Sequence, residues 1–161
     1  MNKRSSLALC AGCLVAAAAV AGSAGAASPK KATVKAQAAS GVVRVHASLD
    51  IAQVTPAPTG AGAGASGKFT ATLEGSILRY TLSFKGLSGI ASSAEIRTGA
   101  RKVAGPIAQP LCVPCFFPPE TGVVPLTAAQ IAALRAGRLY VSVETAADPD
   151  GEIRGQLTIA K

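Results

Sequence analysis

The sequence predicts a mainly β fold, an antiparallel β-sandwich or barrel with one short helix. From residue 42 onward, apolar and polar residues alternate in several short segments, as they do in strands that bury one face. Clusters of Gly, Pro and Asp separate these segments, which is typical of antiparallel sheets. Residues 42–160 therefore form a single predicted domain, long enough to bury a core.

The first half of this domain contains three predicted strands. In the first, Val43, Val45, Ala47 and Leu49 face one side, and Arg44, His46 and Ser48 face the other. Residues 55–67 (TPAPTGAGAGASG) form a Pro/Gly/Ala loop with no large apolar side chain to bury. Strands at residues 68–74 and 78–84 follow, joined by a turn at Gly75-Ser76. Residues 94–98 and 122–124 are predicted as shorter strands.

A short helix and a final hairpin are predicted after residue 126. Thr127 and Gln130 have capping-box spacing, and Gly137 is placed to end the helix. Strict alternation resumes at residue 138, and Asp148-Pro149-Asp150-Gly151 is a turn signal. We expect a hairpin with one buried face. The inward residues would be Leu139, Val141, Val143, Ile153, Gly155, Leu157 and Ile159, and the outward ones Tyr140, Ser142, Glu144, Glu152, Arg154, Gln156 and Thr158.

The N-terminus has the features of a secretory signal peptide. Lys3 and Arg4 precede an uncharged, Ala- and Leu-rich run, and Ala24-Gly25-Ala26 provides small residues for cleavage. We predict a signal peptide over residues 1–26, a flexible leader over residues 27–41, and a secreted or periplasmic protein. The apolar run is short for a membrane span, so no span is expected in the mature chain. A lipoprotein anchored through Cys13 is the alternative.

The charge of the chain favours anionic partners but not nucleic acid. Lys and Arg number 16 against 8 acidic residues, giving a formal net charge of +8. These basic residues are scattered, whereas nucleic-acid binding needs a concentrated basic face, often with stacking aromatics. The chain has only four Phe, two Tyr and no Trp. We therefore expect no nucleic-acid partner, and a basic surface suited to anionic polymers of the cell envelope.

Two segments resemble the CHRD domain, a module first described in chordin. The specific one is LTAAQIAALRAGRLYVSVETAADPDGEIRGQL at residues 126–157. The other is VRVHASLDIAQVTPAPTGAGAGASGKFTATLEGSILRYTLSFKGLSG, at residues 43–89. The resemblance implies an extracellular, Greek-key, immunoglobulin-like β-sandwich over residues 42–160 and no defined catalytic activity.

The chain departs from this family at three positions. Members commonly carry Ala-His-Ile-His in a middle strand and Val-His-Thr after the helix. Here the histidine positions hold Glu95, Arg97 and Glu144. His46 is the only histidine, so a multi-histidine zinc or copper site is not expected. The resemblance places the three side chains together as a polar cluster, which we interpret as a solvated charge ladder, with a ligand site or a paired-carboxylate hydrolase as alternatives.

Cys112-Val113-Pro114-Cys115 is predicted to form a local disulfide. A thioredoxin-like site would start a helix, but Phe116-Phe117-Pro118-Pro119 follows. Free thiols, intermolecular bridging and redox activity are the alternatives. The acidic turn at residues 148–152 is interpreted as a hairpin turn rather than a calcium loop, because it lacks the ligand pattern of an EF-hand.

Two function classes are therefore compared. The first is a secreted or periplasmic non-catalytic module that binds a protein or an anionic polymer at the cell envelope. The second is a secreted enzyme, either thiol/disulfide-active or metal-dependent with a superoxide-dismutase-like fold. The first is favoured because no nucleophile–base arrangement, cofactor motif or metal-ligand set is present in the sequence.

Overall fold

The computed structural model describes residues 41–161. The predicted signal peptide, Cys13 and the predicted leader up to residue 40 lie outside the described residues. In the part that is described, no helix has the length and apolarity needed to cross a membrane.

The described residues form one antiparallel sheet with the strand order β5-β4-β7-β8-β1-β2-β3-β6, and the short strand β9 pairs with β1. The mainly β prediction is thus confirmed. The strands are β1 (Val43–Asp50), β2 (Ser66–Glu74), β3 (Ile77–Lys85), β4 (Ala91–Thr98), β5 (Ile107–Cys112), β6 (Glu120–Pro125), β7 (Leu139–Thr145), β8 (Ile153–Gln156) and β9 (Thr158–Ile159). A short 3₁₀ helix, η1 (Ile51–Gln53), and one α-helix, α1 (Ala128–Arg135), complete the fold.

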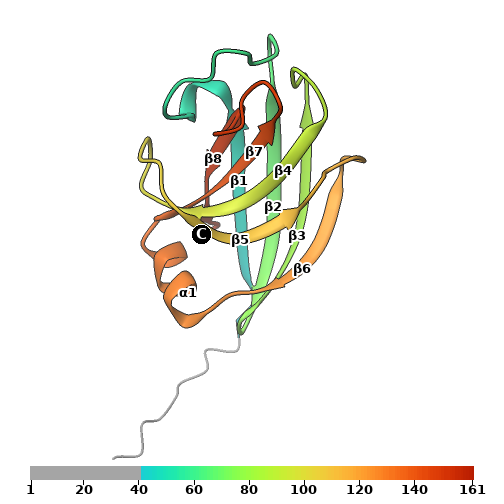
Figure 1. The fold of residues 1–161 in the computed structure, drawn as a ribbon. Coiled ribbons are helices and arrows are strands. Elements are labelled where there is room, and N and C mark those ends of the chain that lie inside the picture. Colours follow the sequence, from blue (N-terminus) through green and yellow to red (C-terminus); the bar gives the residue numbers. More distant parts are fainter. Residues whose placement is uncertain (1–40) are drawn as a thin grey trace, which may run out of the picture. The chain divides into compact units, whose positions relative to one another are not determined.

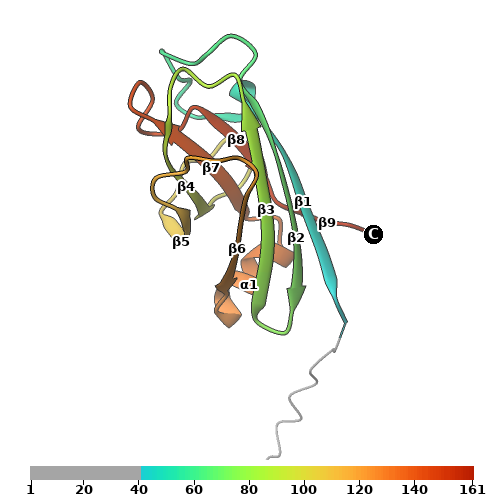
Figure 2. The same cartoon turned by 90° about the vertical axis from the view of Figure 1, so that its right-hand side faces the viewer.

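The sheet curls until its two edges approach each other, so that it is nearly closed into a barrel. Strands β1, β2 and β3 form one layer, and β4, β5, β7 and β8 form the other (Figures 1 and 2). Across the open side, the Tyr80 hydroxyl on β3 donates a hydrogen bond to the Leu111 carbonyl on β5 at 2.7 Å. The Gln130 side chain of α1 donates to the Ala108 carbonyl of β5 at 2.6 Å. Side chains thus satisfy part of the β5 edge that no strand covers.

The core lies between the two layers and follows the predicted alternation. Val45, Ala47 and Leu49 of β1 are buried, while Arg44, His46 and Ser48 point outward. Phe69 of β2 stacks with Tyr80 of β3, their ring centroids 5.8 Å apart. Burying aliphatic and aromatic side chains in this way is the main stabilising contribution to such a fold. Where β8 meets β1, a Cβ at Gly155 would lie 2.5 Å from the Ser48 carbonyl oxygen, so this close approach needs glycine.

The helix forms as the sequence predicts. The Thr127 hydroxyl accepts from the Gln130 N–H, and the Gln130 side chain accepts from the Thr127 N–H, so the capping box is complete. Gly137 has a positive φ of 65° and ends the helix. Leu134 is buried and Ile131 packs against the core, so packing supports a helix too short to be stable alone.

Strand β5 was not predicted from the sequence. Its segment, IAQPLC, contains Pro110, which cannot donate to a ladder and argues against a central strand. The structure places β5 at an edge, paired only with β4, where a proline is tolerated. Strand β4 is also longer than predicted and begins at Ala91.

The prediction of a hairpin with one buried face is wrong. Every residue of β7 is buried, including Tyr140, Ser142 and Glu144 on the outward side. Glu152, directly before β8, is 0 % exposed, and Arg154 on β8 is 3 % exposed. Ile159, predicted inward, is exposed, because the chain leaves β7 after Gln156 and joins β1 as β9. The physical reason for the buried outer face is that loops fold over it.

Candidate functional site

The three residues at the family histidine positions lie together on the outer face of β4 and β7. Antiparallel register places Ser93 opposite Glu144 and Glu95 opposite Ser142. The Arg97 Nε lies 2.9 Å from Glu95 Oε2, and its NH2 group lies 3.2 Å from Glu144 Oε1. Arg97 therefore bridges two carboxylates, so the polar cluster that the resemblance implies does form.

The interpretation of this cluster as a solvated ladder is wrong. Glu95 is 7 % and Glu144 is 8 % exposed. The Ser93 hydroxyl donates to Glu144 Oε2 at 2.7 Å, whereas Glu144 Oε1 accepts no hydrogen bond and is held only by its charge contact with Arg97. Burial acts to lower the pKa of Arg97, but the Glu95 hydrogen bond and both carboxylate charges outweigh it and raise that pKa. The cluster is thus a partly desolvated network in which one guanidinium is shared by two carboxylates.

A small cavity of about 160 Å³ adjoins this cluster. Its lining comes from the loop after η1, the loop between β4 and β5, and the outer face of β7 and β8. The lining residues include Pro56, Arg97, Ala104, Tyr140, Asp150 and Arg154. The Arg154 guanidinium lies over the Tyr140 ring, 3.4 Å from its centroid, and donates to the Ala100 carbonyl at 2.7 Å. Arg154 therefore holds the β4–β5 loop against the sheet and is not free to bind a ligand.

Glu152 is the most heavily bonded acidic side chain on this side of the sheet. Its Oε1 accepts from the backbone N–H groups of Gly62 (2.8 Å) and Ser88 (2.7 Å), and its Oε2 accepts from the hydroxyls of Ser88 (2.6 Å) and Thr145 (2.7 Å). Burial acts to raise the pKa of Glu152, but these hydrogen bonds outweigh it and lower that pKa. One carboxylate thus fastens two loops to the β7–β8 turn.

Asp148 performs a similar role beside it. Its Oδ1 accepts from the N–H groups of Thr59 (2.8 Å) and Gly60 (3.2 Å) in the loop before β2. Asp148 also starts the predicted turn, since the Gly151 N–H donates to its carbonyl at 3.1 Å. From the sequence, this motif is predicted only as a turn. The sequence did not reveal that Asp148 and Glu152 hold loops in place. The available signal was an acidic turn at residues 148–152 together with a distant Gly-rich loop at residues 55–67.

The opposite layer presents a different kind of surface. On the outer face of β1, β2 and β3, register aligns Arg44 with Thr72 and Arg79. The next row aligns His46, Thr70 and Thr81, and the row after it aligns Ser48, Lys68 and Ser83. We call this surface, defined by these nine residues, the open face. Neighbouring strands are about 4.8 Å apart, so cations and hydroxyl groups form a regular grid.

The open face also contains a large depression. It measures about 500 Å³ and is lined by Arg44, His46, Thr70, Thr72, Arg79, Thr81 and their neighbours, with no carboxylate among them. Within residues 41–161, both ion pairs found involve Arg97. The guanidinium groups of Arg44 and Arg79 are therefore available to an external anion.

The CHRD domain family matches residues 45–157. The chain belongs to that family. No curated protein and no solved structure matches the chain. As a CHRD domain, the chain holds Glu95, Arg97 and Glu144 where the resemblance expects histidines, and the fold brings these three positions within contact distance of one another. An ion-paired cluster thus stands where the resemblance expects three histidines.

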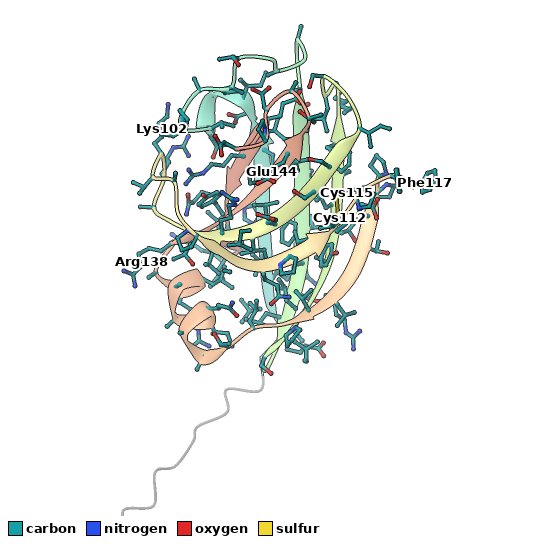
Figure 3. All side chains as sticks on the ribbon, in the orientation of Figure 1. Lys102, Cys112, Cys115, Phe117, Arg138 and Glu144 are labelled. Carbon is teal, nitrogen blue, oxygen red and sulfur yellow. A yellow bond between two sulfur atoms is a disulfide. The ribbon has the colours of Figure 1, made fainter. Side chains whose placement is uncertain are left out.

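The remaining predicted site of this CHRD domain is the cysteine pair. Cys112 and Cys115 form a disulfide, and Cys115 is 1 % exposed (Figure 3). The segment after the disulfide is not helical; Cys115 instead pairs with Ala91 at the start of β4. Among residues 41–161 no group of three or more His, Cys, Asp and Glu is arranged to hold a metal ion.

Proposed function

We propose that this CHRD domain is a non-catalytic module that binds an anionic polymer of the cell envelope on its open face. The observation that carries the proposal is the contrast in charge pairing. Arg97 on the opposite layer is neutralised by two carboxylates, whereas Arg44 and Arg79 line a large depression without any. Hydroxyl groups from Thr70, Thr72 and Thr81 stand between them as further hydrogen-bond partners.

The geometry of the open face fits a repeating anion better than a single small one. Arg44 and Arg79 lie on strands separated by β2, so their Cα atoms are about 10 Å apart. A polymer with regularly spaced phosphate, sulfate or carboxylate groups would contact both guanidinium groups and Lys68 at the same time. Binding of this kind is weakened by salt, because it depends on exposed charges.

The test is binding to polyphosphate, with uncharged dextran as the neutral probe. We expect Arg44→Glu/Arg79→Glu to weaken polyphosphate binding by about tenfold or more at low salt. The matched control is Lys102→Glu/Arg138→Glu, which changes the net charge equally at two exposed positions outside the open face (Figure 3). If both double variants weaken binding equally, the open face is not the binding site and only the overall charge matters.

The proposal includes export of the protein through a signal peptide cleaved near Ala26. The basic N-terminus, the apolar run and the small residues of Ala24-Gly25-Ala26 support it, and so does the disulfide, which is typical of oxidising compartments. N-terminal sequencing of the protein recovered from outside the cytoplasm should begin near Ala27. An intact Met1 or a lipid-modified Cys13 would contradict this export route.

The competing function is a thiol/disulfide-active enzyme, and Cys112–Cys115 is its only candidate centre among the described residues. The lack of a helix after the disulfide weighs against it, because a helix N-terminus is one of the features that lower the thiolate pKa in redox-active Cys-X-X-Cys motifs. Thiol titration with and without reductant, together with an insulin-reduction assay, separates the two functions. Turnover of insulin disulfides that is lost in Cys112→Ser/Cys115→Ser would favour the enzyme.

A further inference from the structure

The three most exposed large apolar side chains of the described residues lie at or beside the disulfide loop. Phe117 is 83 % exposed and Phe116 is 58 % exposed, and Val113 in the same loop and Ile90 beside it are exposed as well. Ile90 is next to Ala91, which pairs with Cys115, so it belongs to the same patch. Phe117 points away from the fold in Figure 3. Large apolar side chains gathered at a protruding tip mark an interaction surface rather than a core.

We propose that the loop of residues 113–119, here named the Phe loop, inserts into the interfacial region of an anionic lipid bilayer. This goes beyond polymer binding on the open face, because its inserting residues lie outside that face and its partner is a bilayer. The protruding shape of the tip matches a soft bilayer surface, and its two aromatic rings are of the kind that enter the headgroup region.

The backbone of the Phe loop has few unsatisfied N–H groups, so its transfer from water to an apolar medium costs little. An unsatisfied N–H group is costly in an apolar medium. Pro114, Pro118 and Pro119 have no N–H group. The Cys115 N–H donates to the Ala91 carbonyl at 3.1 Å, and the Phe117 N–H donates to Glu120 Oε1 at 2.9 Å. Only Val113 and Phe116 contribute further backbone N–H groups. Insertion would therefore leave few donors without a hydrogen-bond partner.

The disulfide lowers the entropic cost of binding. Cys112 and Cys115 close a short ring at the base of the tip, and Cys115 is anchored in the core. The Phe rings are therefore presented by a constrained backbone, and less conformational freedom is lost on insertion.

Positive charge beside the Phe loop indicates an anionic rather than a neutral bilayer. A depression next to the loop is lined by Pro118, Pro119 and Lys68, and Lys68 shares a further depression with Lys85. Each Lys near an anionic membrane surface contributes attraction that falls off within a Debye length. Glu120 is close as well, but its carboxylate is already bonded to the loop backbone.

The sequence offers a direct experiment, because the chain has no Trp. Phe117→Trp in the full chain places a single reporter at the tip. With vesicles of phosphatidylglycerol and phosphatidylcholine, its emission should shift to the blue and be quenched by brominated lipid. Val103→Trp is the control: it lies in the β4–β5 loop next to Lys102, which Figure 3 places on the other side of the molecule from Phe117.

Residues 1–40 are identical in both reporters, so membrane affinity residing there affects them equally. A shift confined to Phe117→Trp supports the proposal. Equal emission shifts in both reporters, or no shift in Phe117→Trp, would overturn the proposal. The absence of any shift in Phe117→Trp would favour a protein as the partner of the Phe loop. Phe116→Ser/Phe117→Ser should weaken vesicle partitioning by about tenfold or more, against little change for Val103→Ser. An unchanged partition coefficient in the double Phe variant would also overturn it.

Discussion

The outer faces of the two layers use polar residues in opposite ways. On β4, β7, β8 and the turn before β8, the charged side chains are bonded to one another or to the loops that cover them; these are Glu95, Arg97, Glu144, Glu152 and Arg154. On β1, β2 and β3, Arg44 and Arg79 have no carboxylate partner within the described residues, and no carboxylate lines the depression between them. Charged residues thus secure loops on the first face and remain available to an external ligand on the second.

This difference makes the open face a better candidate for an external ligand than the family histidine positions. Charges that are already paired gain little by exchanging their partners for an outside ligand. The existing ion pair must first be broken, and the ligand must lose its hydration. Unpaired cations at a surface offer their full long-range field. The covered face is therefore expected to control stability, and the open face to control binding.

The largest effect is expected at Glu152. Glu152→Ala removes a buried carboxylate and leaves four hydrogen-bond donors from Gly62, Ser88 and Thr145 without their acceptor. The free energy of unfolding should fall by about 3–5 kcal/mol. The matched change Glu74→Ala, at an exposed carboxylate on the open layer, should cost less than about 0.5 kcal/mol. Urea unfolding midpoints measure both, and comparable losses would mean that the two layers do not differ as described.

The second prediction compares the cost of changing a buried apolar residue with that of changing a buried polar residue on the same strand. Val141 is 0 % exposed on the inner side of β7, and Val141→Ala should cost about 1–3 kcal/mol through lost burial and a residual cavity. Glu144, on the outer side, keeps its Ser93 bond but loses its charge contact with Arg97 in Glu144→Gln. That change should cost about 1–2 kcal/mol, more than the loss of a surface ion pair. A loss near zero for Glu144→Gln would restore the solvated interpretation of the cluster.

Most of the strands, the helix and the fold class could be predicted because their signals are local, whereas β5 with its proline could not. Alternation at β1, Gly75-Ser76 between β2 and β3, and the Thr127–Gln130 capping box each depend on a few neighbouring residues. The pairing of Glu95, Arg97 and Glu144 required only the family resemblance and strand register.

The burial of that cluster could not be predicted in the same way. A period of two tells which residues share a face, but it does not tell whether a distant loop covers that face. The loop at residues 55–67 has few apolar side chains, so hydrophobic pattern gave no reason to dock it. Its docking instead depends on backbone N–H groups bound by Asp148 and Glu152 from about 90 residues later in the chain.

The third effect is a dependence of stability on pH. The folded state lowers the pKa of Glu152, so the unfolded chain binds a proton at this group more readily than the folded one. Its contribution to stability is therefore present above the ordinary pKa of glutamate, about 4.3, and is lost as the pH falls through the lower folded-state pKa. The loss should be smaller than in Glu152→Ala, because a protonated carboxyl group still occupies the site.

Urea unfolding at pH values between about 3 and 7 tests this dependence. The wild-type midpoint should decline toward acid more steeply than that of Glu152→Gln, which cannot titrate at this position. Glu74→Gln serves as the control for removing an exposed carboxylate. Parallel curves for wild type and Glu152→Gln would show that other groups cause the acid sensitivity.

The smallest effect on stability is expected on the open face, whose charged residues are expected to serve binding rather than stability. Arg44 and Arg79 are exposed and make no ion pair in the described part of the chain, so Arg44→Ala/Arg79→Ala should change the free energy of unfolding by less than about 0.5 kcal/mol. Because removing two neighbouring cations also relieves their mutual repulsion, the change should be neutral or slightly stabilising, and weaker at high salt. Thermal unfolding at low and high salt measures it, with Lys102→Ala/Arg138→Ala as the control of equal charge. A loss above about 1 kcal/mol, larger than a surface charge pair contributes, would mean that the open face is structural after all. In that case weaker polyphosphate binding by its variants would reflect damage to the fold rather than removal of a ligand contact.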